Sequence, residues 1–461
     1  MKILFVVYDN ESRNNALPLG TAYVAAYLRK HGYKDVTYYS QDIYHYTEEH
    51  LYEYLEKNHF DIVAMGFVAG YFQHMKIKKI CDKIAKLKKK PFMVLGGHGP
   101  SPVPEYFIKY LGADAIVMGE GELPFLNLVR ALDNGADLSG VKGITFRNGD
   151  NVVINPREDP IKDLDSIPYP FLEPLPMEYY INSALWTTSP TDRGITMSAQ
   201  RGCVYKCNFC YRLEKGIRFR SADSIVDEVK KYKRDYNINY IWFLDELFML
   251  NKKRVFDICE NFLKHDLNIK YFCTGRLEQA NKEVLGIMKR SGCVAIDYGI
   301  EQFDDGALEK MDKRLTTAEI ESGIKNTLER GIHPAFNIIF GNIGDTRKTL
   351  RKSVDFLNKY NDYGQLRVIR PVTPYPGSPL YDLAIKKNLL KGPGDFYEKH
   401  KNLELLTINF TDIPDDEFHG LMFDANKEII TRYYEHVKKK GIENFRKVYY
   451  EKDFNFRGAR H

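Results

Sequence analysis

Short apolar runs and amphipathic stretches alternate along the first 135 residues. Five runs rich in β-branched residues are each followed by apolar positions at helical spacing. Strands that alternate with helices in this way form a parallel sheet covered on both faces. The expected strands are KILFVV, VTYY, DIVAMGF, FMVLGG and AIVMG, and helices are expected to begin near Leu19, Thr47, His74, Val103 and Glu122. The pattern predicts a doubly wound α/β domain over residues 1–140, with its ligand over the carboxyl ends of the strands.

The segment after residue 140 first predicts a hairpin and then a linker. In GITFRNGDNVVIN, two strand-like runs flank Asn148 and Gly149, a pair that favours the tight turn of a β-hairpin. The following DPIKDLDSIPYPFLEPLP carries too many prolines for regular structure. We therefore expect residues 141–190 to connect two domains.

The second half alternates again, this time with six expected strands. They are ITMSA, YIWFL, KYFCT, VAIDYG, AFNIIF and LRVIRPV, with helices expected to begin near Ala222, Lys252, Asn281, Thr317, Arg347 and Ser378. Consecutive βα units are typical of a barrel or partial barrel of the TIM type, whose chemistry lies at the carboxyl ends of its strands. We expect a partial (β/α)6 TIM-like barrel over residues 191–390. A helical extension over residues 391–461 is expected to cover its open side.

Charge and cysteine content narrow the classes of function. The 461-residue chain carries 67 basic and 62 acidic residues, a net charge of +5, so its composition does not indicate nucleic-acid binding. No apolar run reaches the ~18 residues of a membrane span, and MKILFVVYDNES is more typical of a buried strand than of a signal peptide. Seven cysteines are too few, and odd in number, for a secreted disulfide framework. These features favour a reducing cytoplasm.

Three of the seven cysteines stand together in RGCVYKCNFCYR, spaced C-x3-C-x2-C. Cys203, Cys207 and Cys210 follow the first expected barrel strand, so they lie on a loop at the catalytic face. A structural zinc site usually has four protein ligands, often as paired C-x2-C hooks, and the sequence has no second pair. Three thiolates would leave one iron of a 4Fe-4S cluster open, as a catalytic metal site requires. Three buried loop cysteines or a zinc site are the alternatives.

This loop, with Phe209 before the last cysteine, resembles the cluster loop of the radical S-adenosylmethionine (SAM) superfamily. In that family the amino and carboxylate groups of SAM chelate the open iron. One electron from the cluster then cleaves SAM to methionine and a 5'-deoxyadenosyl radical. The resemblance implies a 4Fe-4S cluster held by Cys203, Cys207 and Cys210, with SAM as cosubstrate.

The same resemblance implies SAM contacts at other strand ends. The candidates are Phe209, Asp245, Glu246, Arg276 and Glu301. A helix N-cap is the structural alternative for the acidic pair, and a structural ion pair is the alternative for Arg276 and Glu301. GNIGDT is similar to the family's G-x-P-G-E-T turn near adenine, but it has Ile343 in place of proline and Asp345 in place of glutamate.

Three stretches of the first half resemble the Rossmann-like cobalamin-binding domain found in one radical SAM subfamily: PLGTAYVAAYLRKHGY, VLGGHGPSPVPE and ADAIVMGEGE. Glycines at strand ends let the backbone approach a large flat macrocycle. The resemblance implies cobalamin contacts at Gly20, Gly66, Gly96, Gly97, His98, Gly119, Glu120 and Gly121. The D-x-H-x-x-G motif of other cobalamin proteins is absent, so no histidine, His98 included, is expected to bind cobalt. A flavodoxin-like phosphate site is the main alternative.

A radical generator and cobalamin in one chain imply a substrate with an unactivated C–H bond. Methylation of carbon in a small molecule or peptide is the first expectation. Cyclisation, ring contraction, decarboxylation or carbon–carbon coupling without methyl transfer is the alternative among enzymes. An electron carrier or sensor is the alternative of another class, although it would not need Asp245, Glu246 or Arg276. The chemistry requires an external one-electron reductant of the flavodoxin or ferredoxin type.

Overall fold

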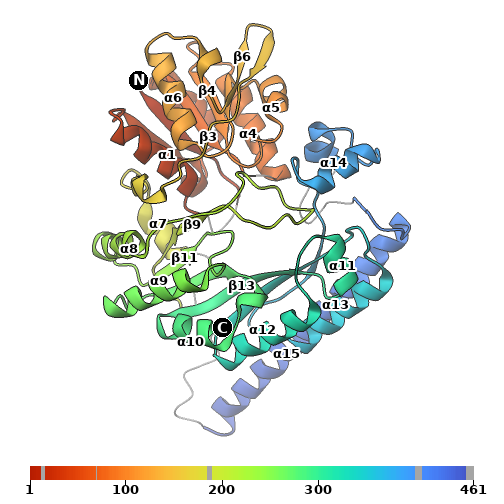
Figure 1. Cartoon of the computed structure of the whole chain (residues 1–461). Coiled ribbons are helices and arrows are strands. Elements are labelled where there is room, and N and C mark those ends of the chain that lie inside the picture. The colour runs from red at the N-terminus through yellow and green to blue at the C-terminus, as the bar shows by residue number, and fades with distance from the viewer. Residues whose placement is uncertain (12–15, 69, 184–188, 400–407, 453–461) are drawn as a thin grey trace.

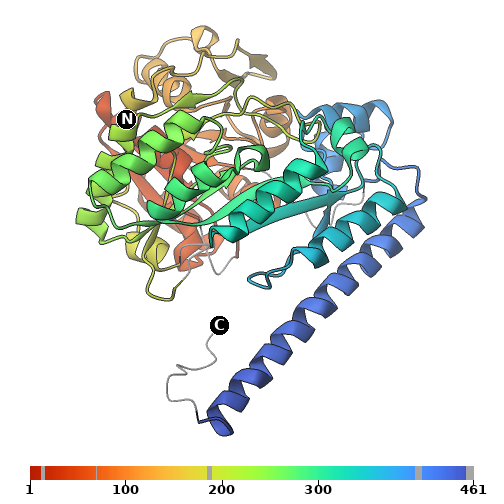
Figure 2. The ribbon, with the colours of Figure 1, turned by 60° about the horizontal axis from the view of Figure 1, so that its bottom comes forward.

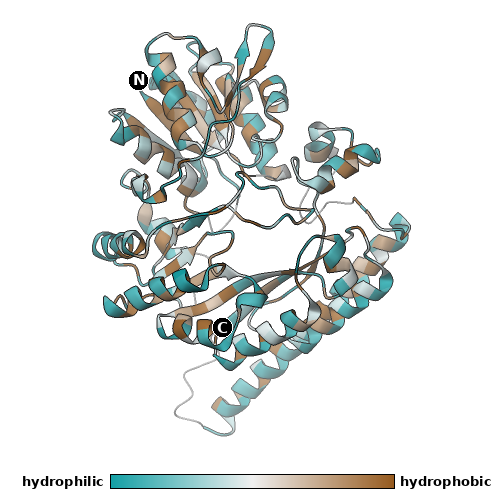
Figure 3. Cartoon of the chain, viewed as in Figure 1, coloured by the Kyte–Doolittle hydropathy of each residue, from teal (hydrophilic) through white to brown (hydrophobic). Residues whose placement is uncertain are grey.

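The structure is a computed structural model that describes residues 1–11, 16–68, 70–183, 189–399 and 408–452. Figure 1 shows an N-terminal α/β unit stacked on a second α/β unit, with a long helix running along the far side of the second. Apolar residues gather on the strands and on the helix faces turned toward them, whereas the outer helix faces are polar (Figure 3). The two predicted α/β halves are therefore present.

The N-terminal sheet has seven strands in the order β2-β1-β3-β4-β5-β6-β7. Its parallel strands are β1 Ile3–Val7, β2 Val36–Ser40, β3 Ile62–Gly66, β4 Phe92–Gly96 and β5 Ala115–Val117. The helices around it are α1 Leu19–Lys30, α2 Gln41–Tyr44, α3 Glu48–Lys57, α4 Tyr71–Ile84, α5 Pro104–Leu111 and α6 Glu122–Asp133. Strand order reverses at β1, with β2 on one side and β3 on the other, and such a switch point is where doubly wound domains bind ligands.

The predicted hairpin extends this sheet. Strands β6 Ile144–Asn148 and β7 Asn151–Ile154 pair with each other, and β6 pairs antiparallel with β5. Gly149 has a φ of +60°, as the tight turn requires. The hairpin therefore belongs to the N-terminal sheet, because β6 is hydrogen-bonded to β5. The domain boundary expected at residue 140 lies before these two strands of the sheet.

The proline-rich segment is packed rather than loose. It contains the 3-10 turn η2 Leu164–Ser166 and is followed by the short helix α7 Met177–Asn182, whereas the 3-10 turn η1 Leu138–Gly140 precedes the hairpin. Leu164, Leu172 and Ile181 are buried in a core that continues into the second domain. Prolines exclude long helices here, but apolar residues between them still bury their side chains against both domains.

The second sheet has six parallel strands in the order β15-β14-β13-β12-β11-β8. They are β8 Gly194–Met197, β11 Tyr240–Phe243, β12 Lys270–Gly275, β13 Cys293–Glu301, β14 His333–Phe340 and β15 Ile369–Pro371. A two-stranded ribbon, β9 Gln200–Arg201 and β10 Arg218–Phe219, flanks the loop that bears the three cysteines. This is the expected partial barrel, open between β8 and β15.

Helices cover the outside of the half-barrel and begin at side-chain caps. They are α8 Ala222–Tyr236, α9 Lys252–Lys264, α10 Lys282–Arg290, α11 Asp305–Lys310, α12 Thr317–Glu329 and α13 Arg347–Lys359. The 3-10 turn η3 Leu277–Gln279 has no side-chain cap, and α14 Pro379–Lys386 packs against the core of the N-terminal domain. Ser221, Asn251, Asn281 and Thr316 each accept a backbone N–H of the first helical turn. Such caps satisfy donors that a helix leaves unpaired, so each helix starts at a fixed point after its strand-end loop.

The C-terminal part contains the π-helix η4 Asp395–Lys399 and the helix α15 Asp415–Tyr449. Figure 2 shows α15 lying beside α13 and then projecting beyond the barrel. The side chain of Asn426 in α15 both donates to and accepts from the backbone of Ile369 in β15, each at 2.9 Å. The extension therefore covers the edge strand of the half-barrel. No helix among the described residues is long and apolar enough to cross a membrane.

Candidate active site

The three predicted cluster ligands lie on one loop beyond the carboxyl end of β8. Cys207 is buried, Cys203 is partly exposed and Cys210 is exposed, and all three are free thiols. Burial, reinforced by the neighbouring thiols, raises the pKa of Cys210 to about 12 although one side of the residue meets solvent. Within the described ranges, no three histidine, cysteine, aspartate or glutamate side chains lie close enough together to hold a single metal ion. A 4Fe-4S cluster does not require that, because each thiolate binds a different iron.

Arg201, two residues before Cys203, joins the start of this loop to the N-terminal domain. Its guanidinium lies 3.0 Å from Glu120 Oε2 and 2.6 Å from Glu122 Oε1. Arg218 in β10 forms a second ion pair with Glu120. Burial alone would raise the pKa of Glu120, but Arg218 and Arg201 outweigh it and hold the pKa below its usual value. Glu120, predicted to contact cobalamin, thus belongs to an interdomain charge network.

The acidic pair after β11 also supports the cluster loop. Asp245 Oδ1 accepts the backbone N–H groups of Ala199 at 2.7 Å and Gln200 at 3.0 Å. Glu246 Oε2 accepts the N–H of Gly202 at 3.0 Å. Asp245 is 2% exposed, and burial raises its pKa to about 7. The predicted SAM contacts therefore differ in place: Asp245 is buried behind the loop, and Glu246 is exposed beside it.

Arg276, at the end of β12, is buried among protein partners. Its Nη2 donates to the carbonyl oxygens of Lys313 at 2.6 Å and Arg314 at 2.8 Å. The guanidinium also lies 3.7 Å from the ring centroid of Tyr205, which is part of the cluster loop. Both Arg276 Nε and the Tyr205 hydroxyl donate to Glu278 Oε1, at 2.5 and 2.9 Å. These contacts are those of a structural ion pair, and they support the loop through Tyr205.

Glu301 ends β13 in an unusual backbone conformation. Its φ of +69° is uncommon outside glycine and marks a constrained position. Lys313 Nζ donates to Glu301 Oε1 at 3.1 Å and lies 5.9 Å from the ring centroid of Phe209. Burial raises the pKa of Cys207, and the charge of Lys313 opposes that shift. Glu301 and Phe209 are therefore brought together by Lys313, a residue for which the sequence offered no signal.

Glycines after the N-terminal strands permit close backbone packing. Gly66 and Gly96 are the last residues of β3 and β4. A Cβ on Gly97, which has a φ of +99°, would lie 2.5 Å from the carbonyl oxygen of Phe67. A Cβ on Gly119 would collide with the carboxylate of Glu214, from the barrel. The backbone carbonyl therefore requires glycine at Gly97, the φ of +83° favours glycine at Gly119, and a Cβ on Gly96 would make only ordinary contact with Val117 at 3.5 Å.

Two other predicted glycines are placed differently. Gly20 lies in the first turn of α1 rather than at a strand end, and a Cβ there would meet nothing within 4 Å. Because β1 ends at Val7 and α1 begins at Leu19, Gly20 lies in the helix and not at the end of the strand. Gly121 caps α6, where a Cβ would approach Val24 Cγ2 at 2.9 Å. A glycine that the sequence did not single out, Gly99, packs against the Phe67 ring.

The two sets of strand ends face each other. His98, after β4, is exposed, and its ring meets that of Tyr211 in the cluster loop edge-on at 6.2 Å. Although His98 has an exposed surface, the protein atoms packed around its ring lower the pKa of His98 by desolvation. Val68, two residues after β3, and Phe72, in the first turn of α4, are 63% and 70% exposed. Exposed apolar side chains at this edge fit a flat, largely apolar ligand.

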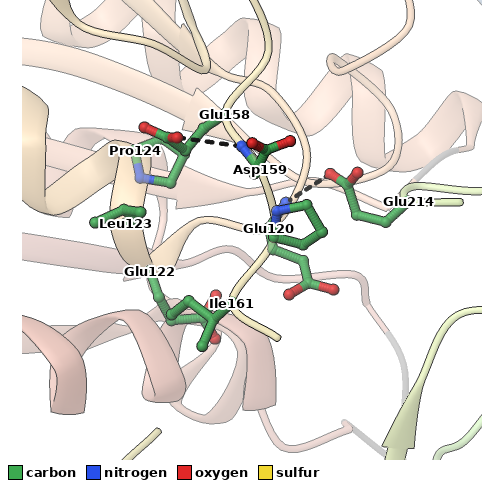
Figure 4. Close-up of a pocket in the computed structure, with 9 residues that line it drawn as sticks. Glu120, Glu122, Leu123, Pro124, Glu158, Asp159, Ile161 and Glu214 are labelled. Carbon is green, nitrogen blue, oxygen red and sulfur yellow. Dashed lines mark hydrogen bonds between the residues drawn. The ribbon is translucent and has the colours of Figure 1, made fainter. Parts of the chain in front are cut away.

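Figure 4 shows a recess at the seam between the two domains. It is lined by Glu120, Glu122, Leu123, Pro124, Glu158, Asp159, Pro160, Ile161 and Glu214. Glu120 and Glu122 bind Arg201, and Glu214 lies 3.0 Å from Arg157 Nη2 and accepts the N–H of Glu120. Its carboxylates are therefore largely committed to domain contact, and the recess is not the candidate site.

Two family profiles match the chain, the B12 binding domain over residues 6–129 and the radical SAM superfamily over residues 197–357. The chain is 31% identical over 403 residues to an uncharacterized methyltransferase of Pyrococcus horikoshii, and the matched region covers 85% of this chain and 84% of that protein. The chain belongs to the cobalamin-binding radical SAM family. This radical SAM enzyme is also 27% identical over 396 residues to an anaerobic magnesium-protoporphyrin IX monomethyl ester cyclase of Rubrivivax gelatinosus, covering 83% and 69% of the two chains.

A solved structure shares the fold. The radical SAM methyltransferase TsrM of Kitasatospora setae superposes with a TM-score of 0.74 at 17% identity, over 92% of this chain and 90% of that one. As a family member, this radical SAM enzyme uses a 4Fe-4S cluster, SAM and cobalamin. The three loop thiols fit the cluster, since thiolates are its usual ligands. The switch-point edge with Val68 and Phe72 fits a macrocycle, and the expected fold class and cofactors are confirmed.

Proposed function

We propose that this radical SAM enzyme transfers a methyl group to an unactivated carbon of a small molecule or peptide. One observation carries the proposal: Arg201 precedes Cys203 by two residues and binds Glu120 and Glu122, which follow β5 of the cobalamin-type domain. The cysteine loop and the loop after β5 are therefore in direct contact through this ion-pair network. The name of the Pyrococcus horikoshii relative, a methyltransferase, supports the same reaction.

The chain's own residues hold this arrangement. When bound, the cluster supplies the electron that cleaves SAM, and cobalamin supplies a methyl carrier. Cys203, Cys207 and Cys210 present thiols for three irons. The Arg201 network fixes the cluster loop against the N-terminal domain, and the Tyr205–Arg276 stack fixes it against the barrel. Rigid placement matters because misplacement of reacting groups by ~1 Å can cost ~100-fold in rate.

Of the residues predicted to contact SAM, Glu246 and Glu301 are the best candidates for direct binding. Glu246 is exposed beside Gly202 of the cluster loop, and Glu301 lies near the predicted ligand Cys207, whose pKa its charge raises. Asp245 and Arg276 act instead by positioning the loop, because their contacts are with backbone and side chains of the protein.

Turnover with methyl-deuterated SAM tests the reaction. The reconstituted enzyme, a low-potential reductant and a pool of candidate metabolites or peptides should yield a deuterium-labelled product by mass spectrometry. S-adenosylhomocysteine and 5'-deoxyadenosine should both form, because SAM serves once as methyl donor and once as radical source. A labelled product with only one of the two coproducts would contradict the proposed scheme.

The second candidate is radical cyclisation or rearrangement without methyl transfer. It is favoured by the identity to the Rubrivivax gelatinosus cyclase. That reaction would give an unlabelled product with unchanged carbon count, together with 5'-deoxyadenosine and no S-adenosylhomocysteine. The same experiment therefore separates the two candidates.

We further infer a one-electron donor of the flavodoxin or ferredoxin type and a reducing cytoplasm. All seven cysteines lie in the described part of the chain as free thiols, which supports a reducing compartment. A pull-down with flavodoxin and ferredoxin, followed by 5'-deoxyadenosine assay with each as sole reductant, tests the donor. Failure of both carriers to support turnover, under conditions where dithionite does, would contradict it.

A further inference from the structure

The cluster loop has a fastening point that no cysteine provides. The side-chain amides of Asn208 and Asn342 face each other, and each donates to the other: Asn208 Nδ2 to Asn342 Oδ1 at 3.0 Å, and Asn342 Nδ2 to Asn208 Oδ1 at 2.8 Å. Asn208 lies between Cys207 and Cys210, whereas Asn342 lies in the turn after β14. A reciprocal amide pair fixes distance and orientation together, because both bonds are lost if either amide turns.

The backbone of Asn208 is held as firmly as its side chain. Its N–H donates to the carbonyl oxygen of Met311 at 3.0 Å, and its own carbonyl oxygen accepts the N–H of Leu380 at 2.8 Å. Its Nδ2 also donates to the carbonyl oxygen of Lys310 at 3.2 Å. Asn208 therefore joins the loop to the end of α11, to the start of α14 and to the turn after β14.

Asn342 carries this connection to the end of β13. Asp345 closes the turn by accepting the N–H groups of Gly341 and Asn342, both at 2.9 Å. The other carboxylate oxygen of Asp345 accepts Gln302 Nε2 at 2.7 Å, and Gln302 directly follows Glu301. Asn342 and Asp345 are fully or nearly fully buried, so these bonds do not compete with water.

We infer that the Asn208–Asn342 pair is a positioning device that sets the cluster loop against the ends of β13 and β14, where SAM must reach the open iron. The three thiolates would hold a cluster on the loop, but they would not fix the loop relative to the barrel. The amide pair supplies that reference. The inference rests on SAM cleavage, which the family shares, and not on methyl transfer.

Asn208→Ala, Asn342→Ala and the double variant test the pair. All three should bind iron as wild type does, since the cysteines remain. The SAM concentration that half-saturates the SAM-induced change in the EPR spectrum of the reduced cluster should rise about tenfold, as expected when a buried pair of hydrogen bonds is lost. The KM for SAM in 5'-deoxyadenosine formation should rise with it. The double variant should be no worse than Asn208→Ala, because removing Asn208 already breaks both bonds of the pair and the bond to the Lys310 carbonyl.

Two further variants separate positioning from packing. Asn208→Asp keeps the volume but turns an oxygen toward Asn342 Oδ1 and the Lys310 carbonyl, so its effect should equal or exceed that of alanine. Asn326→Ala is the matched control, because its Nδ2 donates to the Ala280 carbonyl at 3.0 Å on the outer helices. It should lower the melting temperature of the cluster-free chain without changing the SAM dependence.

The inference is overturned if the iron-loaded Asn208 variants keep the wild-type SAM dependence, or if the two alanine effects multiply as for independent sites. Should Asn342→Ala fail to fold, Asn208→Asp decides alone, because Asn208 is only half-buried and the volume is unchanged. Loss of SAM response in Asn326→Ala to the same extent would also overturn it.

Discussion

The two facing edges of this molecule are built by different physical means. At the N-terminal edge, Gly97 and Gly119 let loops approach so closely that a Cβ would clash with Phe67 or Glu214. At the barrel edge, buried polar side chains hold the cluster loop: Asp245 accepts the backbone N–H groups of Ala199 and Gln200 just before the loop, and the Arg276 guanidinium stacks on Tyr205 within it. Added side-chain volume should therefore destabilise the first edge, and loss of buried hydrogen-bond partners should destabilise the second.

The largest expected effect is at the barrel edge, where a ligand is removed. Cys207→Ala should lose the cluster and all 5'-deoxyadenosine formation, because two thiolates remain for a cluster that requires three. Iron analysis and product assay measure this. Cys259→Ala is the control, since that thiol is buried on α9 and contacts Tyr271. A full iron complement in Cys207→Ala would refute the ligand assignment.

The next effect is at the network where the two edges meet. Arg201→Met keeps the apolar stem but removes the partner of Glu122 and leaves Glu120 paired with Arg218 alone, and breaking a buried ion pair costs about 3–5 kcal/mol. Thermal or urea unfolding should show this loss. Arg201→Lys, which keeps the charge but not the two-pronged geometry, should lose less. Equal stability of wild type and Arg201→Met would mean that the network does not hold the domains.

Added volume tests the N-terminal edge. Gly97→Ala should cost about 1–3 kcal/mol, because it places a side chain at a φ of +99° and against the Phe67 carbonyl. It should weaken cobalamin retention and leave iron content unchanged. Gly112→Ala isolates the backbone term, since its φ is +71° and a Cβ there meets nothing within 4 Å. If both variants behave alike, close approach is not what Gly97 provides.

The smallest effect is a pH dependence at the barrel edge. The folded pKa of Asp245, about 7, lies above its unfolded value of about 3.9, so its contribution is fully present below the unfolded pKa and is lost as pH rises through the folded pKa. Between pH 6 and 8 the wild type should lose about 1 kcal/mol from this group. Asp245→Asn should remove that difference, and exposed Asp257→Asn should keep it. Urea unfolding of the three proteins at pH 6 and at pH 8 measures this difference in the free energy of unfolding.

The alternation of apolar runs predicted both α/β units, because parallel strands buried on two faces leave a strong pattern. The cysteine spacing led to the cluster loop for a similar reason: three ligands from one loop are a local property of the chain. Asp245 and Arg276 were placed at the right strand ends, yet their partners lie far along the sequence, at Ala199 and Lys313. Spacing cannot reveal which charges a fold will bury.

The glycines also show that sequence position alone does not reveal which distant segment a residue contacts. Gly97 was predicted from its place after a strand, and that place is correct. The reason for it, the carbonyl oxygen of Phe67, depends on how β3 and β4 pair. Gly20 carried the same signal and lies in a helix, because the length of the loop after β1 is not encoded in the motif. Pairings between distant segments, such as Asn208 with Asn342, leave no sequence pattern.

The contact between Asn426 and Ile369 has a consequence for the behaviour of the half-barrel in concentrated solution. An open parallel sheet presents an edge whose unpaired N–H and C=O groups invite strands of other chains, the first step of many aggregation reactions. Here a helix side chain takes the place of the next strand, and Pro371 in the same strand has no N–H to offer. The half-barrel can therefore stay unclosed while the backbone of Ile369 in its edge strand has hydrogen-bond partners within the chain.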